Sequence, residues 1–336
     1  MPFAVHTRTQ PGVSGLDATI FTLEDGQGTR AEVWPALGFN CFSWHAIVAG
    51  KPLSLLYADP NLFSDGRPTR SGIPILFPFP NRIRAGRFRW EGKDYQMPLT
   101  DNIKKNSIHG FACRRPWRVV GQGADANSAW LTGEFRGSLD AKDCLGLWPA
   151  DYEIRVTYRL GANRLRVEAE VANPDKVSLP FGLGYHPYYR LPFTAGFAAA
   201  DCTMTVPAAS YWDLTDCFPN GPRRAVDTGR DLNPMRRFPD LNLDDVLTDL
   251  PTLTPGPDGL IERAKLVGAP GAAMRLYCSP DFREMVVFTP GNREAFCVEP
   301  YTCTTDAINL QQQGVDAGWR SLPPGGRWSG VFEMRV

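Results

Sequence analysis

Apolar and polar residues alternate along several stretches of the chain, and this period of two is typical of half-buried β-strands. The clearest stretch is "DYEIRVTYRLGANRLRVEAEVAN", residues 151–173. Its apolar positions are Tyr152, Ile154, Val156, Tyr158, Leu160, Leu165, Val167, Ala169 and Val171. A turn at Gly161-Ala162-Asn163 separates the two halves. The pattern predicts a long β-hairpin with one buried face.

A second hairpin is predicted in "GRFRWEGKDYQMP", residues 86–98. Phe88 and Trp90 precede an expected turn over 91–94, and Tyr95 and Met97 follow it. Further predicted strands are "TIFTLED" (19–25), "AEVWP" (31–35), "FSWHAIV" (42–48), "MRLYCS" (274–279), "MVVFTP" (285–290) and "SGVFEMRV" (329–336).

Helical periodicity is weak throughout the chain. Thirty prolines and 32 glycines are dispersed along it, so few and short helices are expected. One or two helical turns are predicted within "FPDLNLDDVLTDL", residues 238–250. No repeat or linker divides the sequence, so residues 1–336 are expected to form a single domain. The prediction is an all-β fold, a large antiparallel sandwich with more strands than an immunoglobulin domain.

Composition narrows the function classes. Lysine plus arginine and aspartate plus glutamate number 36 each, so no overall field attracts nucleic acid or an anionic membrane. No stretch has the length of apolar residues that a membrane span needs, and the N-terminus lacks a signal-peptide pattern. Eight cysteines show no C-x-x-C pair and no zinc-type spacing. We therefore expect a soluble, cytoplasmic protein that binds neither nucleic acid nor membrane.

Chemistry must come from side chains, because the sequence has no phosphate-binding loop, no dinucleotide-binding glycine motif and no nucleophile elbow. No cofactor and no metal are predicted. In "FPFPNRIRAGRF" the prolines restrict the backbone just before Asn81 and Arg82. These two side chains are candidates to donate to hydroxyl oxygens of a ligand. The alternative is that the arginines of this stretch are solvated charges at a strand edge.

Two of the four histidines lie in unusual contexts. His109 precedes Gly110 in "NSIHGFACRRPW", and His186 stands among aromatic residues in "FGLGYHPYYRLP". Taken alone, each is as well explained by a structural role as by a catalytic one. Aromatic rings beside an imidazole fit the apolar faces of a sugar, and they equally fit a packed core.

Carboxylates complete the candidate set. Glu299 follows the apolar run Ala-Phe-Cys-Val, so it is expected at the end of a buried strand, where desolvation would raise its pKa towards that of a general base. The alternative is an ion pair with an arginine. Asp244 and Asp245 in "LNLDDVLTDL" are a further candidate pair, of which at most one should face a given site. Two histidines, a buried carboxylate and an Asn-Arg pair suit acid-base chemistry on a neutral, hydroxyl-rich molecule.

Five segments, in order from about Asn81 to Leu310, resemble the aldose 1-epimerase (galactose mutarotase) family. They are "PNRIRAGRF", "SIHGF", "GYHPYYRL", "NLDDVLTDL" and "VEPYTCTTDAINL". The resemblance implies a β-sandwich of the galactose-mutarotase type with a sugar site on one sheet. It implies an isomerase that interconverts the α and β anomers of a hexose by opening and reclosing its ring, without a cofactor.

The resemblance also implies individual roles. Glu299 would be the base that removes the proton of the C1 hydroxyl, and His186 the acid that protonates the ring oxygen. His109 would orient the sugar. Asn81, Arg82 and Asp244 would bind its hydroxyls, with Asp244 chosen over Asp245 because it directly follows Leu243. The expected partner is a monosaccharide, and the expected state is a monomer or homodimer.

Three segments depart from the better-known galactose mutarotases. Pro300-Tyr301 follows the glutamate in place of Thr-Gln, "HGFACRRPW" replaces a longer glycine-rich segment, and Pro187 follows the second histidine. The pocket wall, and with it the sugar, should therefore differ. One alternative is a hexose-6-phosphate 1-epimerase using Arg84, Arg87, Arg114 or Arg115, and turnover on free and phosphorylated hexoses separates the two. Another is a carbohydrate-binding protein without catalysis.

Overall fold

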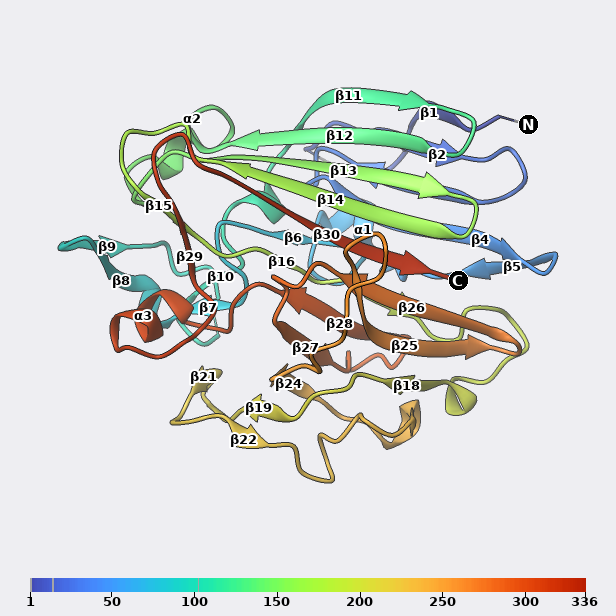
Figure 1. Cartoon of the computed structure of the whole chain (residues 1–336). Helices are drawn as coiled ribbons and strands as arrows, with labels where there is room; N and C mark the ends of the chain where they lie inside the picture. The colour runs from blue at the N-terminus through green and yellow to red at the C-terminus, as the bar shows by residue number, and fades with distance from the viewer. Residues whose placement is uncertain (1, 14, 102) are drawn as a thin grey trace.

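A computed structural model describes residues 2–13, 15–101 and 103–336, and shows two large antiparallel sheets packed face to face (Figure 1). The sequence favours this arrangement because alternating apolar residues give each sheet one face that must be buried. A third, N-terminal sheet lies beside the first strands of the larger sheet. The prediction of an all-β sandwich with few short helices is confirmed.

The larger sheet runs in the order β11-β12-β13-β14-β30-β26-β25-β18-β23. Its strands are β11 (Arg118–Ala124), β12 (Ala129–Arg136), β13 (Glu153–Gly161), β14 (Arg164–Ala172), β30 (Arg327–Arg335), β26 (Ala272–Cys278), β25 (Ile261–Ala269), β18 (Thr203–Thr205) and β23 (Arg236–Arg237). The C-terminal strand β30 lies between β14 and β26, so it joins the two halves of this sheet.

The second sheet, called here the site sheet, runs in the order β22-β19-β24-β27-β28-β16-β6, with β17 also paired to β28. Its strands are β22 (Arg224–Ala225), β19 (Ser210–Trp212), β24 (Asp244–Thr248), β27 (Glu284–Phe288), β28 (Ala295–Tyr301), β16 (Gly184–Tyr185), β6 (Ile75–Leu76) and β17 (Tyr188–Arg190).

Smaller elements complete the fold. The N-terminal sheet contains β1 (Ala4–Thr9), β2 (Thr19–Glu24), β3 (Arg30–Trp34), β4 (Asn40–Val48) and β5 (Lys51–Ser54). Paired short strands are β7 (Arg82–Ile83) with β10 (Ser107–Ile108), β8 (Arg87–Trp90) with β9 (Lys93–Gln96), β15 (Leu179–Phe181) with β29 (Arg320–Leu322), and β20 (Leu214–Thr215) with β21 (Phe218–Pro219). Short helices are α1 (Leu62–Asp65), α2 (Gly137–Asp140) and α3 (Ala307–Gln312), with 3-10 turns η1 (Arg84–Gly86), η2 (Ala112–Arg114), η3 (Lys142–Cys144), η4 (Ala199–Asp201) and η5 (Phe238–Asp240).

The core fills the space between the two large sheets. Val287 and Val298 of the site sheet belong to the same buried cluster as Val156 and Tyr158 of the larger sheet. Tyr185 stacks on Phe332 of β30, with ring centroids 5.7 Å apart. Because residues alternate between the faces of a strand, the neighbours of Val287 and Val298 point to the opposite face of the site sheet.

The long hairpin is confirmed as β13 and β14, and its nine predicted apolar residues are all buried. The second hairpin is also present, but its predicted turn is too long. Trp90 pairs with Lys93, so the turn is only Glu91-Gly92, both with positive φ, and Lys93 and Asp94 belong to β9. Such two-residue turns match the twist of the strands that they join.

The helical prediction within residues 238–250 is wrong for most of that stretch. Only the 3-10 turn η5 forms, and Asp244 to Thr248 are strand β24 in the interior of the site sheet. Pairing with strands on both sides outweighs the weak local preference for helix. In the described part of the chain, no helix has the length and apolar character required to cross a membrane.

A buried glutamate gives the site sheet a measurable dependence on pH. Glu284 begins β27 with 0% exposure, and its Oε2 accepts a hydrogen bond of 3.2 Å from the Trp212 indole. Burial raises the pKa of Glu284 from 4.5 to about 8. The folded chain therefore holds this proton over a pH range in which the unfolded chain releases it.

We expect the wild-type free energy of unfolding to fall, relative to that of Glu284→Gln, as pH rises from about 4.5 to 8. The reason is that the glutamine cannot ionise, whereas the glutamate must either keep a proton or be buried with a charge. Urea unfolding of both proteins at several pH values measures the difference. Parallel stability curves for the two proteins would contradict this assignment.

Candidate functional site

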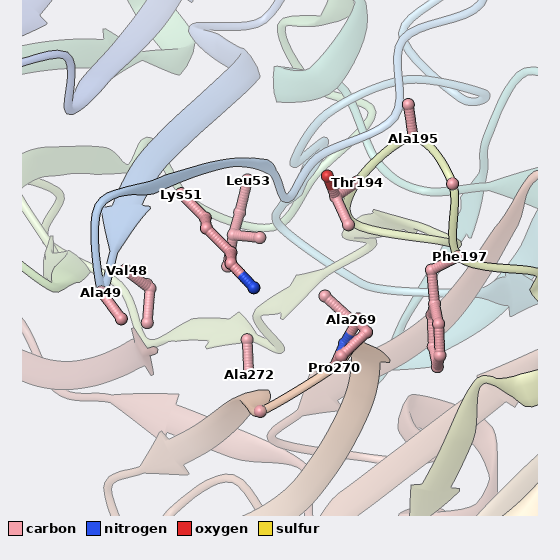
Figure 2. A pocket seen from close by; sticks show the side chains of 12 residues that line it. Val48, Ala49, Lys51, Leu53, Thr194, Ala195, Phe197, Ala269, Pro270 and Ala272 are labelled. Carbon is pink, nitrogen blue, oxygen red and sulfur yellow. The ribbon is translucent and has the colours of Figure 1, made fainter.

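Besides a pocket of about 500 Å³ against the β8–β9 hairpin, whose lining includes Arg87, two pockets of sufficient size for a small ligand differ in character. One, of about 410 Å³, lies between the β4–β5 hairpin and the turn after β25, and most of its lining is apolar (Figure 2). It contains none of the residues that the sequence singled out. The other, of about 570 Å³, is lined by both polar and aromatic side chains and includes His186 and Tyr188. The second pocket therefore marks the candidate site.

Strand register brings the candidate residues together. Gly184 pairs with Tyr301 and Tyr188 pairs with Cys297, so the same register places His186 directly opposite Glu299. Side chains that are directly opposite in an antiparallel pair lie on the same face. This is the face of the site sheet turned away from the core. Gly184 is required here because a Cβ would lie 2.5 Å from the Tyr301 ring.

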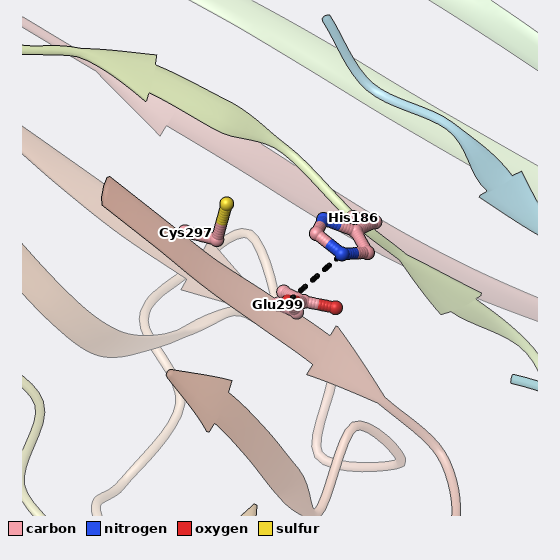
Figure 3. A group of neighbouring side chains, drawn as sticks. All are labelled: His186, Cys297 and Glu299. Atoms are coloured by element: carbon pink, nitrogen blue, oxygen red, sulfur yellow. Dashed lines mark ion pairs between the residues drawn. The ribbon is translucent and has the colours of Figure 1, made fainter. Parts of the chain in front are cut away.

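His186 and Glu299 are in direct contact. The imidazole Nε2 lies 3.3 Å from Glu299 Oε1, as Figure 3 shows. The Tyr301 hydroxyl donates a 2.6 Å hydrogen bond to the other carboxylate oxygen, Oε2. Tyr188 stacks on the imidazole, with ring centroids 4.6 Å apart and an interplanar angle of 7°. Both members of the pair are thus held in fixed orientations by their neighbours.

His109 approaches the pair from a separate loop. Its ring meets that of His186 edge to face, with centroids 5.8 Å apart. The loop is held by a hydrogen bond from the His109 amide to the Asn81 carbonyl, 2.8 Å. Among the described residues, Nδ1 of His109 and Nδ1 of His186 have no hydrogen-bond partner. The site therefore contains two buried imidazole nitrogens whose hydrogen-bonding capacity is unused.

Burial favours the neutral form of each group in this cluster. Desolvation raises the pKa of Glu299 well above its ordinary value, although the Tyr301 hydrogen bond acts to lower it. Desolvation also lowers the pKa of His186 to about 3, and, together with the nearby His186, holds that of His109 well below its ordinary value. Both shifts favour the uncharged pair, a protonated Glu299 carboxyl and a neutral His186 imidazole, which together hold one proton.

Asn81 and Arg82 lie beside this cluster rather than in its centre. Asn81 has a positive φ of 53° and joins Arg82 through a 3.3 Å side-chain hydrogen bond. The Arg82 guanidinium also pairs with Asp101 at 2.8 Å. Its positive charge acts on His109 and on Asp244. The strand-edge alternative is therefore incomplete, because Arg82 is anchored and contributes to the field of the site.

The two adjacent aspartates point to opposite faces of β24. Asp244 pairs with Phe288, which pairs with Cys297, so Asp244 shares the face of the site. Asp244 keeps contact with solvent, but desolvation by the surrounding protein raises its pKa, although the nearby Arg82 acts to lower it. Asp245 points the other way and is bound by Arg230 at 2.6 Å. Asp244, the residue chosen from the sequence, is thus the one available at the site.

The structure adds neighbours that the sequence did not single out. Cys297 and Tyr301 flank Glu299 at a spacing of two, so a strand prediction places them on its face. Arg70 and Asn292 line the pocket from loops that only the tertiary fold brings close, so no signal in the sequence could identify them.

The arginines considered for a phosphate are mostly engaged elsewhere. Arg84 lies over the Phe218 ring and 3.9 Å from Asp306, Arg87 donates to Gln96, and Arg115 forms a two-pronged pair with Asp143. The Arg114 charge acts on His109. These side chains do not surround one anion.

The sandwich has the fold of galactose mutarotase-like structures. The sequence profile of the family described as Aldose 1-epimerase matches residues 21–335, and the chain belongs to that family. Its members are enzymes that act on carbohydrates. The resemblance noted from the five segments is therefore confirmed at the level of the family.

Solved structures agree in fold. A galactose mutarotase-like protein from Clostridium acetobutylicum superposes with a TM-score of 0.84 at 20% identity, covering 99% of this chain and 98% of that one. Galactose 1-epimerase from Lactobacillus acidophilus gives 0.75 at 17% identity, covering 99% and 98%.

Curated relatives from Escherichia coli K12 match over shorter stretches. The uncharacterized protein YihR is 33% identical over 122 residues, which is 36% of this chain and 37% of YihR. The uncharacterized protein YphB is 28% identical over 137 residues, 41% of each. Each match spans less than half of the relative's length.

Gly110 supports the loop of His109, and its replacement tests that support. Gly110 has a φ of 62°, and an added Cβ would lie 2.2 Å from the Phe77 carbonyl oxygen. We expect Gly110→Ala to destabilise the protein by at least about 2 kcal/mol more than Gly271→Ala. Gly271 has a similar φ of 72° but open space around it, so it controls for backbone strain. Chemical denaturation measures both variants, and equal losses would show that packing at Gly110 is loose.

Proposed function

We propose that this protein is an aldose 1-epimerase that interconverts the α and β anomers of a hexose by acid-base catalysis. The observation that carries the proposal is the 3.3 Å contact between His186 Nε2 and Glu299 Oε1 on a sheet face that a sugar can reach through the adjoining pocket. Proteins of the same fold include a galactose mutarotase-like protein and a galactose 1-epimerase, and this supports a hexose as the substrate.

Ring opening needs a base at the C1 hydroxyl and an acid at the ring oxygen O5. Both oxygens are bonded to C1, so the two catalytic groups must lie close to each other, and the observed pair meets this requirement. Glu299 takes the proton of the C1 hydroxyl while His186 gives a proton to O5, and the C1–O5 bond breaks to leave an aldehyde. Rotation about C1–C2 then presents the other face, and the two residues exchange roles as the ring closes.

One shared proton is sufficient for this cycle. Low dielectric disfavours either charge alone, but the carboxylate and imidazolium attract each other strongly at this separation. During ring opening one proton passes from the C1 hydroxyl to Glu299 and another passes from His186 to O5. The pair therefore still holds one proton afterwards, and no water is required at C1. Burial favours the uncharged pair, a protonated carboxyl and a neutral imidazole, so the ionised pair that opens the ring forms when that one proton moves from Glu299 to His186.

The remaining residues hold the sugar. Asp244 accepts hydrogen bonds from hydroxyl groups, and Arg82 and Asn81 donate to hydroxyl oxygens. His109, edge-on to His186, orients the region of O5. The rings of Tyr188 and Phe288 provide apolar surface beside the imidazole. These groups select a hydroxyl-rich ring and keep C1 beside the acid-base pair.

We expect Glu299→Gln and His186→Asn each to lower the mutarotation rate by about 10²-fold or more, because each removes a positioned proton-transfer group. Polarimetry of freshly dissolved α-glucose and α-galactose measures the rate above the spontaneous one. Glu284→Gln is the matched control, since it makes the same change at another buried glutamate of the site sheet.

The control should retain wild-type activity. If the wild-type chain accelerates equilibration no more than Glu299→Gln does on any sugar of a monosaccharide panel, the protein is a carbohydrate-binding protein and the proposal fails. Saturation-transfer binding measurements on the same panel then identify the bound sugar.

The Tyr301 hydroxyl is expected to lower the pKa of the catalytic base, Glu299. Its hydrogen bond to Glu299 favours the carboxylate, so Tyr301→Phe should raise the pKa of Glu299 further. The base would then lose its charge at a higher pH, and the acid limb of the kcat/KM profile should shift to higher pH. Rates measured from pH 4 to pH 9 in ~1-unit steps resolve this shift. A uniform loss of rate at every pH would instead indicate a purely structural role.

A further inference from the structure

The pair of His186 and Glu299 has a third chemically active neighbour. Cys297 precedes Glu299 by two residues on β28, so its side chain is on the same face of the strand. The imidazole nitrogen, the carboxylate oxygen and the Cys297 sulfur all lie within 4.8 Å of one another, and Figure 3 shows the three side chains together. The thiol is fully buried and forms none of the hydrogen bonds found among the described residues. Acid-base epimerisation gives this thiol no task.

Imidazole nitrogen, thiolate sulfur and carboxylate oxygen are all ligand types that Zn²⁺ takes in proteins. Tetrahedral zinc with ligand bonds of about 2.0–2.2 Å separates nitrogen and oxygen ligands by about 3.3–3.5 Å. The observed distance between His186 Nε2 and Glu299 Oε1 is 3.3 Å. Rotation about the Cα–Cβ bond of Cys297 adjusts the remaining ligand. A single carboxylate beside a thiol offers too few oxygen ligands for Mg²⁺ or Ca²⁺.

The surroundings already orient the ligands. The Tyr301 hydroxyl holds Glu299 Oε2, which leaves Oε1 directed at His186. A partner of this kind positions a ligating carboxylate in many metal sites. The pocket lies beside His186, and through it a water or a sugar hydroxyl would reach a fourth position.

We propose that His186, Cys297 and Glu299 bind Zn²⁺, or a similar borderline-soft transition-metal ion, and that the ion inhibits the enzyme. Binding forms bonds from the metal to Nε2, Sγ and a carboxylate oxygen, and the thiol proton, with any proton on the pair, passes to solvent. The ion thereby occupies the lone pairs that the acid and base require. Inhibition rests on the proposed function, whereas metal binding does not.

The binding test uses the full chain freed of metal with EDTA and then desalted. Calorimetric titration with zinc chloride should give one ion per chain. Cobalt chloride should give the near-ultraviolet absorption band of a thiolate–cobalt bond. In Cys297→Ser the band should disappear and the zinc affinity should fall at least about tenfold. Cys278→Ser, which alters another fully buried cysteine in the larger sheet, should behave as wild type.

The activity test follows mutarotation by polarimetry. Zinc should inhibit wild type, EDTA should restore the rate, and Cys297→Ser should be active without metal and need at least about tenfold more zinc for half-inhibition. If Cys297→Ser does not fold, Cys297→Ala replaces it in both tests. Absence of stoichiometric binding, or binding unchanged by the Cys297 variant, overturns the metal site. The calorimetry and cobalt spectrum decide this even if the chain has no epimerase activity, so the two proposals fail separately.

Discussion

The antiparallel register between β28 and the broken strand formed by β16 and β17 is the constraint on which the site depends. It places His186 opposite Glu299, Tyr188 opposite Cys297 and Gly184 opposite Tyr301. Pro187 lacks a backbone N–H, so it interrupts the strand between β16 and β17 without changing this register. A slip of β28 by one residue would turn Cys297, Glu299 and Tyr301 to the core face.

The opposite face of the same strands fixes that register. Val298 and Phe296 of β28, and Tyr185 and Tyr189 of the broken strand, all enter the core that the two large sheets share. Turning them outward would expose a large apolar area, which is unfavourable by roughly 25 cal/mol for each Å². The hydrophobic face therefore holds the polar face in place, and the catalytic candidates need no mutual attraction to stay together.

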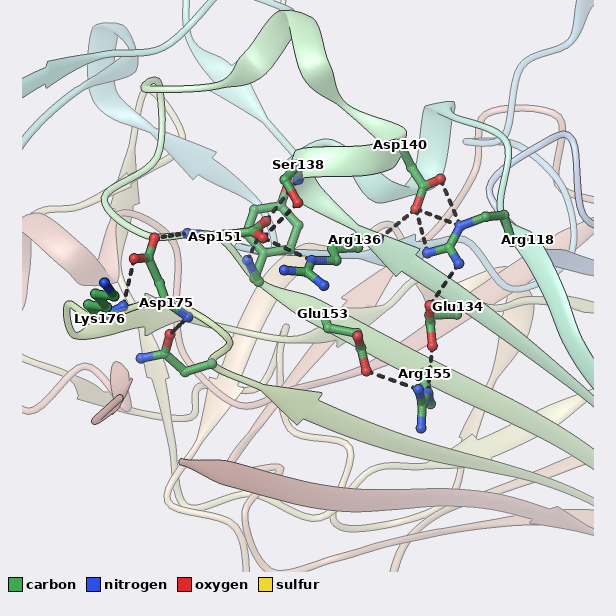
Figure 4. A network of polar contacts seen from close by, with 12 residues as sticks. Arg118, Glu134, Arg136, Ser138, Asp140, Asp151, Glu153, Arg155, Asp175 and Lys176 are labelled. Carbon is green, nitrogen blue, oxygen red and sulfur yellow. Dashed lines mark hydrogen bonds and ion pairs between the residues drawn. The ribbon is translucent and has the colours of Figure 1, made fainter. Parts of the chain in front are cut away.

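Elsewhere in the molecule, a buried carboxylate is stabilised as an anion by ion pairs with arginines. On the larger sheet, Arg118, Glu134 and Arg155 lie directly opposite one another on β11, β12 and β13 and form ion pairs of 2.6–2.8 Å (Figure 4). Burial acts to raise the pKa of Glu134, but the hydrogen bonds of both guanidinium groups lower it overall. In the part of the chain that the structure describes, Glu299 contacts the His186 imidazole and the Tyr301 hydroxyl, with the Cys297 thiol nearby, and it pairs with no guanidinium or ammonium group. The carboxyl pKa of the same residue type is thus lowered in one sheet and raised in the other.

The sequence by itself determined the elements whose pattern is local. Alternation over 151–173 fixed the long hairpin, and proline and glycine content left little room for helices. The five motif segments were sufficient to name the candidate residues and the family. Strand β24 was predicted as helix because its pairing partners are distant in the sequence. The length of the Glu91-Gly92 turn was overestimated because Lys93 and Asp94, although polar, are paired within the hairpin.

Only the tertiary structure decided what surrounds those residues. Whether Asp244 or Asp245 faces the site depends on the face of β24, which the sheet sets by burying Leu247. The closeness of His109 depends on a loop held by the Asn81 carbonyl, and that of Cys297 on a strand register. Sequence carries the identity of each side chain, whereas distance, desolvation and pKa arise from contacts between segments up to 237 residues apart, such as Tyr57 and Glu294 at the pocket.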